Sequence, residues 1–309
     1  MGRPSTPRSF QHAIFRVPFR GGPVLFCLYT GRVLRIGTAG FSYKDWHGPV
    51  YPDPKPAGFD ALRFLADFFP CVEMNTSFYG VPKPASVAKW VETVRDHDDF
   101  RFTFKLYRGL THGTEDDQLA PFLEALAPCR DAGRLGAILL QFPFFFRNTQ
   151  PNRARLGWLA AGLRGWPCAV EVRDNSWLQP AALDFLRRLD LNLCDIDICQ
   201  TRESVPPGAW TTGPLGYVRL HGRNADAWFD KRATVNEKYN YLYSETELKE
   251  WVEHVRRIVA ETDSTYVITN NHFGGRAVAN GLQLLKHLTG DAPAAPPQLR
   301  QAFPELAAR

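Results

Sequence analysis

Eight short apolar runs alternate with segments of helical periodicity, and this alternation constrains the fold of the 309-residue chain more than any other feature. Near-continuous apolar runs are typical of parallel strands that are covered on both faces. The runs cover residues 34–38, 71–75, 100–105, 137–141, 169–173, 192–196, 217–221 and 266–270. The clearest helical segment follows the seventh run, where Leu248, Trp251, Val252 and Val255 form an apolar stripe behind a capping-box pattern at Ser244.

Eight strands that alternate with about seven helices predict a closed (β/α)8 barrel, or TIM barrel, as a single α/β domain over residues 33–290. Residues 1–32 are predicted to form a basic, disordered extension, and residues 291–309 a C-terminal tail. The main alternative is a doubly wound open sheet, which often carries a Gly-x-Gly-x-x-Gly turn after its first strand. Residues 37–40, Gly-Thr-Ala-Gly, lack that spacing. The connection 197–216 shows no clear helical pattern.

The excess of basic residues is confined to the start of the chain. Residues 1–44 hold seven of the 37 Lys and Arg residues and none of the 32 Asp and Glu residues, so the remainder is close to neutral. This distribution gives no argument for a nucleic-acid partner. No apolar run approaches the roughly 18–20 residues of a membrane helix. The six cysteines lack metal-binding spacing and lie mostly in apolar stretches. We therefore expect a soluble, cytoplasmic protein with no membrane partner.

Polar side chains recur at the C-terminal ends of the predicted strands, where TIM-barrel enzymes place their active sites. Residues two apart on a strand share a face, so Glu171 and Arg173 are predicted to point into the barrel while Val172 faces the helices. The charged members of the set, Asp195 included, are all expected to face inward. The set consists of Glu73, Asn75, Lys105, Gln141, Glu171, Arg173, Asp195, Arg219, His221, Asn270 and Asn271.

Two interpretations of this polar set are open. Charges inside a barrel are costly unless they are paired or used, and three acids facing three bases can form a network that only stabilises the fold. The first interpretation is such a structural network, and the second, which we favour, is a functional site. In it, Glu73 or Glu171 is the general acid or base, His221 is a proton shuttle, and Lys105 belongs to the same catalytic group. Lys105, Arg173 and Arg219 hold the anion or stabilise developing negative charge.

The loop after the last strand adds a second signal. Gly274 and Gly275 precede a helix that begins near Arg276, and the free backbone N–H groups at a helix N-terminus favour an anion. Aromatic residues crowd the same rim. Tyr79 is predicted to stack on a ligand, although most of the others are expected to pack the loops together. Histidines are too few near the mouth to favour a metal, and no other cofactor is expected.

Six short motifs occur in a fixed order along the chain. They are GTAGFSYKDW at 37–46, VEMNTSFY at 72–79, QFP at 141–143, EVR with SW at 171–177, RLHG at 219–222 and NN with a later glycine at 270–275. This ordered set resembles the family called domain of unknown function 72, the YecE-like proteins. The resemblance implies a TIM barrel but no activity, because that of the family is not established. Asp174 and Asn175 stand where many relatives have His, and Gly80 where many have Arg.

These observations favour an enzyme that acts on a small anionic ligand, phosphorylated or sugar-like, at the C-terminal mouth of the barrel. Hydrolase, isomerase and lyase chemistry all remain open. One alternative is a nucleic-acid-binding protein, since the barrel of the family has been likened to that of apurinic endonucleases, although this chain does not supply their metal-binding histidines. A further alternative is a scaffold without catalysis.

Overall fold

The computed structural model describes residues 14–15, 26–29, 31–290 and 294–306 of the chain. Eight parallel strands form a closed barrel, because β3 pairs with β10 along most of its length and with β4 through its last residues. The barrel strands are β3 (Arg32–Ala39), β4 (Cys71–Met74), β5 (Arg101–Lys105), β6 (Leu135–Gln141), β7 (Cys168–Glu171), β8 (Asn192–Ile198), β9 (Leu215–Gly222) and β10 (Ser264–Thr269). The predicted (β/α)8 barrel is therefore confirmed, with a strand at each of the eight apolar runs.

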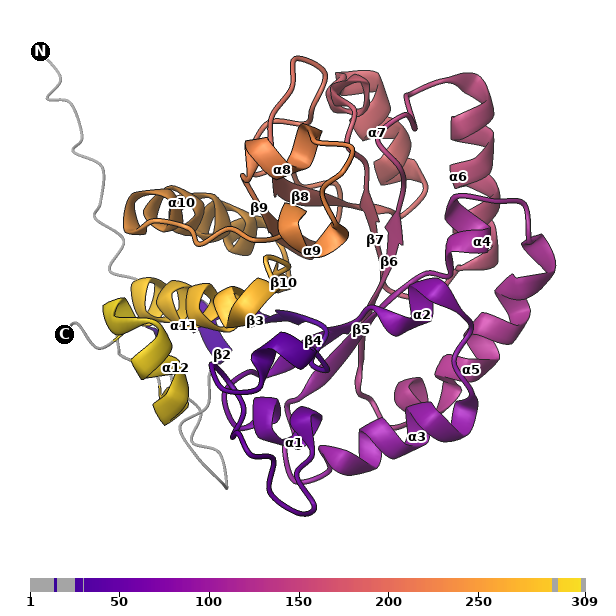
Figure 1. Ribbon diagram of the computed structural model, residues 1–309. Helices are drawn as coiled ribbons and strands as arrows, with labels where there is room; N and C mark the ends of the chain where they lie inside the picture. The colour runs from indigo at the N-terminus through magenta and orange to yellow at the C-terminus, as the bar shows by residue number, and fades with distance from the viewer. Residues whose placement is uncertain (1–13, 16–25, 30, 291–293, 307–309) are drawn as a thin grey trace, which may run out of the picture.

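Longer helices surround the barrel, as Figure 1 shows. They are α1 (Ala61–Ala66), α3 (Pro84–Thr93), α5 (Leu119–Asp131), α6 (Gln150–Gly162), α7 (Pro180–Arg188), α10 (Glu245–Glu261) and α11 (Arg276–Thr289). Ser244 caps α10 with the predicted capping box. The connection from β8 to β9 contains no helix among its described residues, as its Pro- and Gly-rich sequence indicates.

Short helical turns lie at the C-terminal ends of the strands. The α-helical ones are α2 (Thr76–Tyr79), α4 (Arg108–Thr111), α8 (Ala225–Phe229) and α9 (Val235–Lys238). The 3-10 turns η1 (Lys44–Trp46), η3 (Asn175–Leu178) and η4 (Phe273–Gly275) also follow strands, whereas η2 (Asp116–Gln118) precedes α5. In Figure 1, α8 and α9 lie in front of β8 and β9, so this view faces the mouth of the barrel.

The side chains of each strand divide between the barrel interior and the helix layer. On β9, Tyr217 and Arg219 point inward, whereas Val218 and Leu220 pack with apolar residues of α10 and α11. Small and apolar side chains such as Ala137 fill the middle of the interior, and below them the buried Arg35 lies over the Tyr266 ring. Charged side chains occupy the upper interior, which places them directly beneath the mouth.

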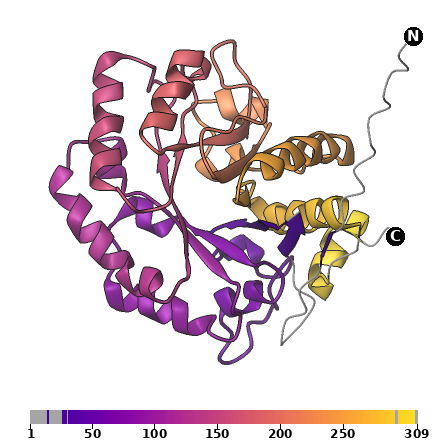
Figure 2. The same cartoon turned by 180° about the vertical axis from the view of Figure 1, so that it is seen from behind.

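Both ends of the chain add to the barrel. In the predicted disordered extension, β1 (Ile14–Phe15) and β2 (Phe26–Tyr29) form antiparallel pairs, and β2 pairs with the first half of β3. Figure 2 shows β2 on the side away from the mouth. The rest of residues 1–30 lies outside the described residues. In the predicted tail, α12 (Pro297–Ala302) buries Leu299, with Phe303 next to it and η5 (Pro304–Leu306) beyond.

No helix in the described ranges is long and apolar enough to cross a membrane. The cysteines whose side chains are described are all buried and free of disulfides. Burial raises the pKa of the Cys71 thiol and of the Cys129 thiol to about 12, which keeps both thiols protonated and unreactive.

Candidate functional site

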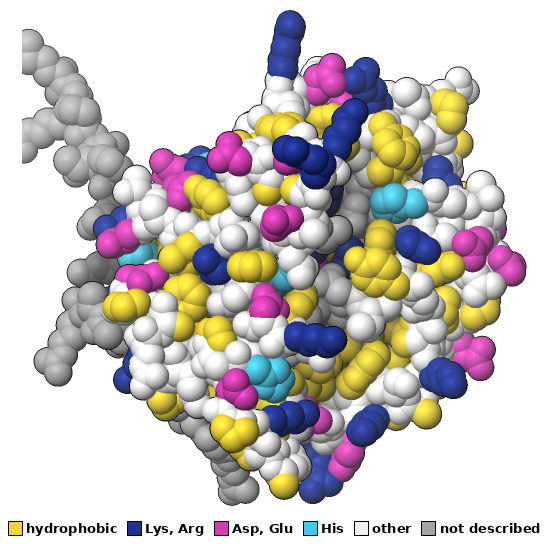
Figure 3. All heavy atoms as spheres, in the orientation of Figure 1, with side chains coloured by type: hydrophobic (Ala, Val, Ile, Leu, Met, Phe, Trp, Pro, Cys, Tyr) yellow, Lys and Arg dark blue, Asp and Glu magenta, His cyan; other side chains and the backbone are white. Residues whose placement is uncertain are grey.

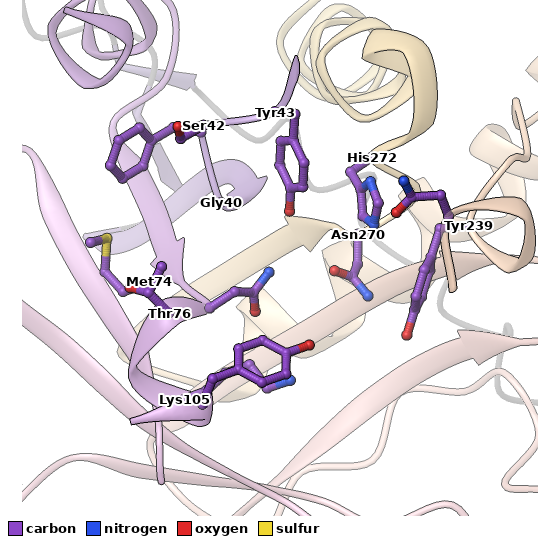
Figure 4. A pocket seen from close by; sticks show the side chains of 13 residues that line it. Gly40, Ser42, Tyr43, Met74, Thr76, Lys105, Tyr239, Asn270 and His272 are labelled. Atoms are coloured by element: carbon purple, nitrogen blue, oxygen red, sulfur yellow. The ribbon is translucent and has the colours of Figure 1, made fainter. Parts of the chain in front are cut away.

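A pocket of about 320 Å³ opens at the C-terminal mouth of the barrel, and we call it the mouth pocket. Figure 4 shows Lys105 on one side of it and Tyr43 on the other, with Tyr239, Asn270 and His272 between them on the right. Segments from five parts of the chain contribute its walls. The lining residues are Gly40, Phe41, Ser42, Tyr43, Met74, Asn75, Thr76, Tyr79, Lys105, Asn236, Tyr239, Asn270 and His272.

Beneath the mouth pocket lies an ion-pair network of four side chains, Glu73, Glu171, Arg173 and Arg219. Arg219 donates from Nη2 to Glu73 at 2.7 Å and from Nη1 to Glu171, and Arg173 donates to the other oxygen of Glu171 at 2.9 Å. Glu73 and Glu171 are fully buried. Burial alone would raise the pKa of Glu171, but Arg219, His221 and Arg173 hold it well below its usual value. Two acids and two bases leave the network neutral.

Tyr217 and Thr103 extend this network toward the bottom of the barrel. The Tyr217 hydroxyl lies 2.9 Å from Glu73 Oε2 and 2.8 Å from Thr103 Oγ1. Sequence reasoning missed both residues. Strand periodicity could have predicted both, because residues two apart on a strand share a face. Tyr217 is two residues before Arg219, and Thr103 is two residues before Lys105.

His221 lies fully buried beside the ion-pair network. Its Nδ1 is 2.8 Å from the Asn270 side-chain amide, and its Nε2 is 3.5 Å from Glu171 Oε1. Burial lowers its pKa to about 4, although Glu171 acts in the opposite direction. The imidazole is therefore neutral near pH 7. The tautomer with hydrogen on Nε2 satisfies both contacts.

Lys105 ends β5 and is the cation that reaches the mouth pocket from below. Its side chain is 9% exposed and its Nζ lies 4.1 Å from the centre of the Phe78 ring. No carboxylate of the described residues forms an ion pair with it, because Glu73 and Glu171 are bound by the arginines. Burial first, and then the charge of Arg219, lower the pKa of Lys105 to about 7.

The first loop of the mouth pocket is held by contacts between distant parts of the chain. Tyr43 donates to the Ala39 carbonyl at 2.5 Å and stacks on His272 with ring centres 4.5 Å apart. Gly40 adopts φ +81°, and a Cβ there would lie 2.7 Å from the Tyr43 hydroxyl. A side chain at Gly40 would therefore be strained and would displace Tyr43.

The connection from β9 to α10 brings Tyr239 and Asn236 over the pocket. Arg223 anchors it, because its Nε donates to Asp197 at 2.9 Å and its Nη1 to Glu247 at 3.1 Å. Tyr241 donates to the same Glu247 oxygen at 2.6 Å. These contacts place Tyr239 5.2 Å from the His272 ring, on the wall opposite β4.

The prediction that Asp195 faces inward is wrong. On β8 the residues that share the barrel interior are Cys194, Ile196 and Ile198, so Asp195 points outward between strand and loop. Its Oδ1 accepts the Trp210 backbone N–H at 3.0 Å. Burial raises the pKa of Asp195 well above its usual value. Asp195 and Asp197 share the outer face of β8 and the inner face is apolar, so the alternation separates the two faces but does not say which one is inside.

Asn271 also lies outside the mouth pocket. Its amide donates to the Tyr241 carbonyl and to Asn280, both at 2.8 Å. Asn271 therefore ties the connection between β9 and α10 to α11. Successive strand-end residues point in opposite directions, and of the two asparagines only Asn270 lines the pocket.

The predicted anion site at the start of α11 already holds a carboxylate of the protein. The Gly274 backbone N–H donates to Asp45 Oδ2 at 2.6 Å, and Gly275 is buried against Val50. Both glycines have positive φ, at +59° and +85°. Asp45 thus takes up the Gly274 N–H that the sequence assigned to an external anion, in the turn just before Gly275, the N-cap of α11.

The remaining predicted residues fall in three places. Asn75 and Tyr79 line the mouth pocket, with Tyr79 66% exposed at its rim. Gln141 is buried inside the barrel and donates to the Phe142 carbonyl at 2.8 Å. Arg173 belongs to the ion-pair network. Sequence reasoning did not assign Tyr43, Asn236, Tyr239 or His272 to the site, although the aromatic residues of the loops were the available signal.

Two polar atoms of the pocket walls are buried without a partner among the described residues. They are Asn75 Oδ1 and His272 Nδ1. Burial lowers the pKa of His272 to about 4, so its ring is neutral near pH 7. Unpartnered buried acceptors are costly in isolation, and hydroxyl donors of a ligand satisfy such atoms. Within the described ranges, no three His, Cys, Asp or Glu side chains are grouped to hold a metal ion.

Comparison with known proteins gives a family match that covers the barrel and extends through α12. The family model described as Protein of unknown function DUF72 matches residues 35–303. UPF0759 protein YunF of Bacillus subtilis is 31% identical over 259 residues, which are 78% of this chain and 91% of that protein. UPF0759 protein YecE of Escherichia coli K12 is 38% identical over 104 residues, 32% of this chain and 37% of that protein.

Solved structures agree with this assignment. A DUF72 family protein of Enterococcus faecalis V583 has a TM-score of 0.72 at 32% identity, covering 83% of this chain and 95% of that chain. A DUF72 family protein of Thermotoga maritima has a TM-score of 0.71 at 31% identity, covering 83% and 99%. The chain belongs to the DUF72 family, a family of TIM-barrel proteins of unknown function.

Proposed function

We propose that the protein is an enzyme that binds a small anionic, hydroxylated ligand in the mouth pocket, with Lys105 as the group that contacts the anion and transfers a proton. The observation that carries this proposal is the charge balance around Lys105. The ion-pair network below is neutral by itself, so a protonated Lys105 adds one uncompensated positive charge next to the pocket. An anionic ligand supplies the missing charge.

The walls of the mouth pocket support a hydroxylated ligand. Among the described residues, the acceptor Asn75 Oδ1 and the ring nitrogen His272 Nδ1, a donor or an acceptor according to its tautomer, have no partner, and Asn236 and Asn270 bring further amides to the pocket. Tyr79 and Tyr239 offer aromatic faces of the kind on which sugar rings pack. Among the described residues that line the pocket there is no Asp or Glu, so these walls contain no carboxylate that repels an anion.

In this proposal Glu73 and Glu171 act through Lys105 rather than on the ligand. Both are fully buried and bound to arginines, and neither lines the mouth pocket. They position Arg219, whose charge lowers the pKa of Lys105 after the larger effect of burial, and their own negative charges partly offset that of Arg219. A lysine with a pKa near 7 suits proton transfer at neutral pH.

The surface around the mouth gives less support to a nucleic-acid ligand. Figure 3 shows Lys and Arg side chains and Asp and Glu side chains both spread over this face. A continuous basic stripe is the usual footprint of a nucleic-acid groove. We therefore place the ligand inside the pocket rather than across the rim.

Thermal denaturation with a panel of sugar phosphates, sugar acids and matched uncharged sugars tests the proposal. We expect anionic members to raise the melting temperature of the wild type, and Lys105→Met to abolish that shift. Lys89→Met is the matched control, because Lys89 is exposed on α3 outside the pocket. Equal shifts in wild type and Lys105→Met, or shifts by uncharged sugars alone, contradict the proposal.

A further inference from the structure

Hydrogen bonds to the neighbouring strands fix the backbone around Lys105. The Ser77 hydroxyl lies 2.7 Å from both the Lys105 carbonyl and the Met74 carbonyl, and the Leu106 N–H donates to the Leu139 carbonyl at 2.9 Å. These contacts fix the end of β5 against β4 and β6. The stem of Lys105 is buried and its Nζ lies over the Phe78 ring, so the amine is directed into the mouth pocket from a fixed base.

The surroundings of Lys105 also favour loss of its proton. The two carboxylates nearest in the barrel are engaged by Arg219 and Arg173, and both arginines place positive charge close to the amine. Burial is the largest cause and Arg219 adds to it, while the charges of Glu73 and Glu171 act in the opposite direction, and the pKa of Lys105 falls to about 7. Near neutral pH the amine is therefore divided between the ammonium form, which binds an anion, and the free form, which is a nucleophile.

We propose that Lys105 is a covalent nucleophile that forms an imine with an α-keto acid bound in the mouth pocket. The inference rests on the proposed function and names its substrate class. An α-keto acid places a carboxylate next to an electrophilic carbonyl carbon. It therefore offers one group that interacts with the ammonium form of Lys105 and one that reacts with the free amine. The ammonium form attracts the carboxylate, and the free amine attacks the adjacent carbon.

Hydroxyl groups on the keto acid match the rest of the pocket. Asn75 Oδ1 is a buried acceptor without a partner among the described residues, and it lies at the end of β4, the strand next to β5. His272 Nδ1 is a second buried polar atom without a partner among these residues, and a hydroxyl group can donate to it or accept from it. A keto acid derived from a sugar carries hydroxyl donors for both, whereas pyruvate has none.

The covalent step balances without an oxidant, a reductant or a metal ion. The Lys105 nitrogen lone pair forms a bond to the carbonyl carbon, and the carbonyl π electrons move to oxygen, which gives a carbinolamine. The carbon–oxygen bond then breaks, and the oxygen leaves as water with the two hydrogens of the amine. The product is an imine that, once protonated, withdraws electrons from the neighbouring carbon and makes bond cleavage or proton loss there easier.

Reductive trapping tests this step on the full chain. The protein is incubated with pyruvate or hydroxypyruvate, borohydride is added, and the adduct is measured by intact mass and located by peptide mapping. We expect one dominant adduct per chain, on Lys105, and faster trapping by hydroxypyruvate because of its hydroxyl group. Trapping should increase as the pH rises through about 7, because the free amine is the reactive form.

Lys105→Arg separates the two proposals. Arginine keeps a positive charge at this position but forms no imine of this kind, so trapping should fall to background while the melting shift with anionic ligands persists. Lys89→Arg should leave both unchanged. Labelling spread over surface lysines, or no labelling of a wild type that binds anions through Lys105, overturns the imine and leaves the proposed function standing. If anion binding also proves independent of Lys105, both proposals fail.

Discussion

Arg219 donates two hydrogen bonds to Glu73, from Nη2 to Oε1 at 2.7 Å and from Nε to Oε2 at 3.0 Å, and neither side chain is more than 1% exposed. This bidentate pair leaves Nη1 of Arg219 free to bind Glu171. One arginine thereby joins two strands that are distant in sequence, β4 and β7, through the centre of the barrel. The upper interior of the barrel is an ionic core rather than a set of independent polar groups.

Glu171→Gln tests this description. The change keeps the shape of the side chain but leaves the Arg219 and Arg173 charges with one carboxylate fewer, so we expect a loss of about 3 kcal/mol in the free energy of unfolding. Urea denaturation measures it, with the exposed Glu124→Gln on α5 as the control, expected within about 0.5 kcal/mol of the wild type. A loss below about 1.5 kcal/mol, the ordinary range for point mutants, would return Glu171 to the role of general acid or base predicted from the sequence.

Lys105→Met should stabilise the protein, and more so at low pH. The folded-state pKa of about 7 lies below the usual value of 10.5, so between these limits the unfolded state binds a proton that the folded state does not. Wild-type stability therefore falls as the pH drops from 9 to 6, and methionine removes this loss. We expect the advantage of Lys105→Met to grow by up to about 2–3 kcal/mol over that interval. An advantage that is constant with pH contradicts the depressed pKa.

Asp45 should stabilise the glycine turn that leads into α11, and an external anion should be able to replace its carboxylate. Asp45→Ala removes the acceptor of the Gly274 N–H and should cost about 1–3 kcal/mol, the usual effect of losing a hydrogen bond to a charged group. Phosphate or sulfate should restore part of this stability by occupying the vacated position, whereas the wild type should respond less. Asp45→Asn keeps an acceptor and should cost less than Asp45→Ala. Calorimetry with and without phosphate decides between these outcomes.

The fold could be predicted from the sequence because each barrel strand is buried on both faces and is therefore visible as an apolar run. The same periodicity brought Glu73, Glu171 and Arg219 together, since the face of a strand repeats every second residue. It failed for Asp195, because on β8 the acids lie on the outer face and the apolar Cys194 and Ile196 face the interior, the reverse of the arrangement on β4 and β7. It failed for Asn271, because the residue lies just past β10 and points away from Asn270.

The walls of the mouth pocket were harder to predict. Tyr43, Tyr239 and His272 lie on loops, and their meeting depends on contacts such as that between Asp45 and Gly274, which are 229 positions apart. Loops have no periodicity that reveals direction. The aromatic residues were visible in the sequence, but only the Tyr43–His272 stack and the Arg223 anchor show which of them face the mouth pocket.

The central claim is that Lys105 is an uncompensated, easily deprotonated amine at the base of the mouth pocket. NMR titration of the lysine side-chain nitrogen and adjacent carbon signals measures this directly, with Lys105→Arg to assign the resonance. We predict a pKa of about 7 for Lys105, which rises when an anionic ligand binds because the ligand stabilises the ammonium form. A pKa near the usual 10.5 that does not change with ligand would contradict the account.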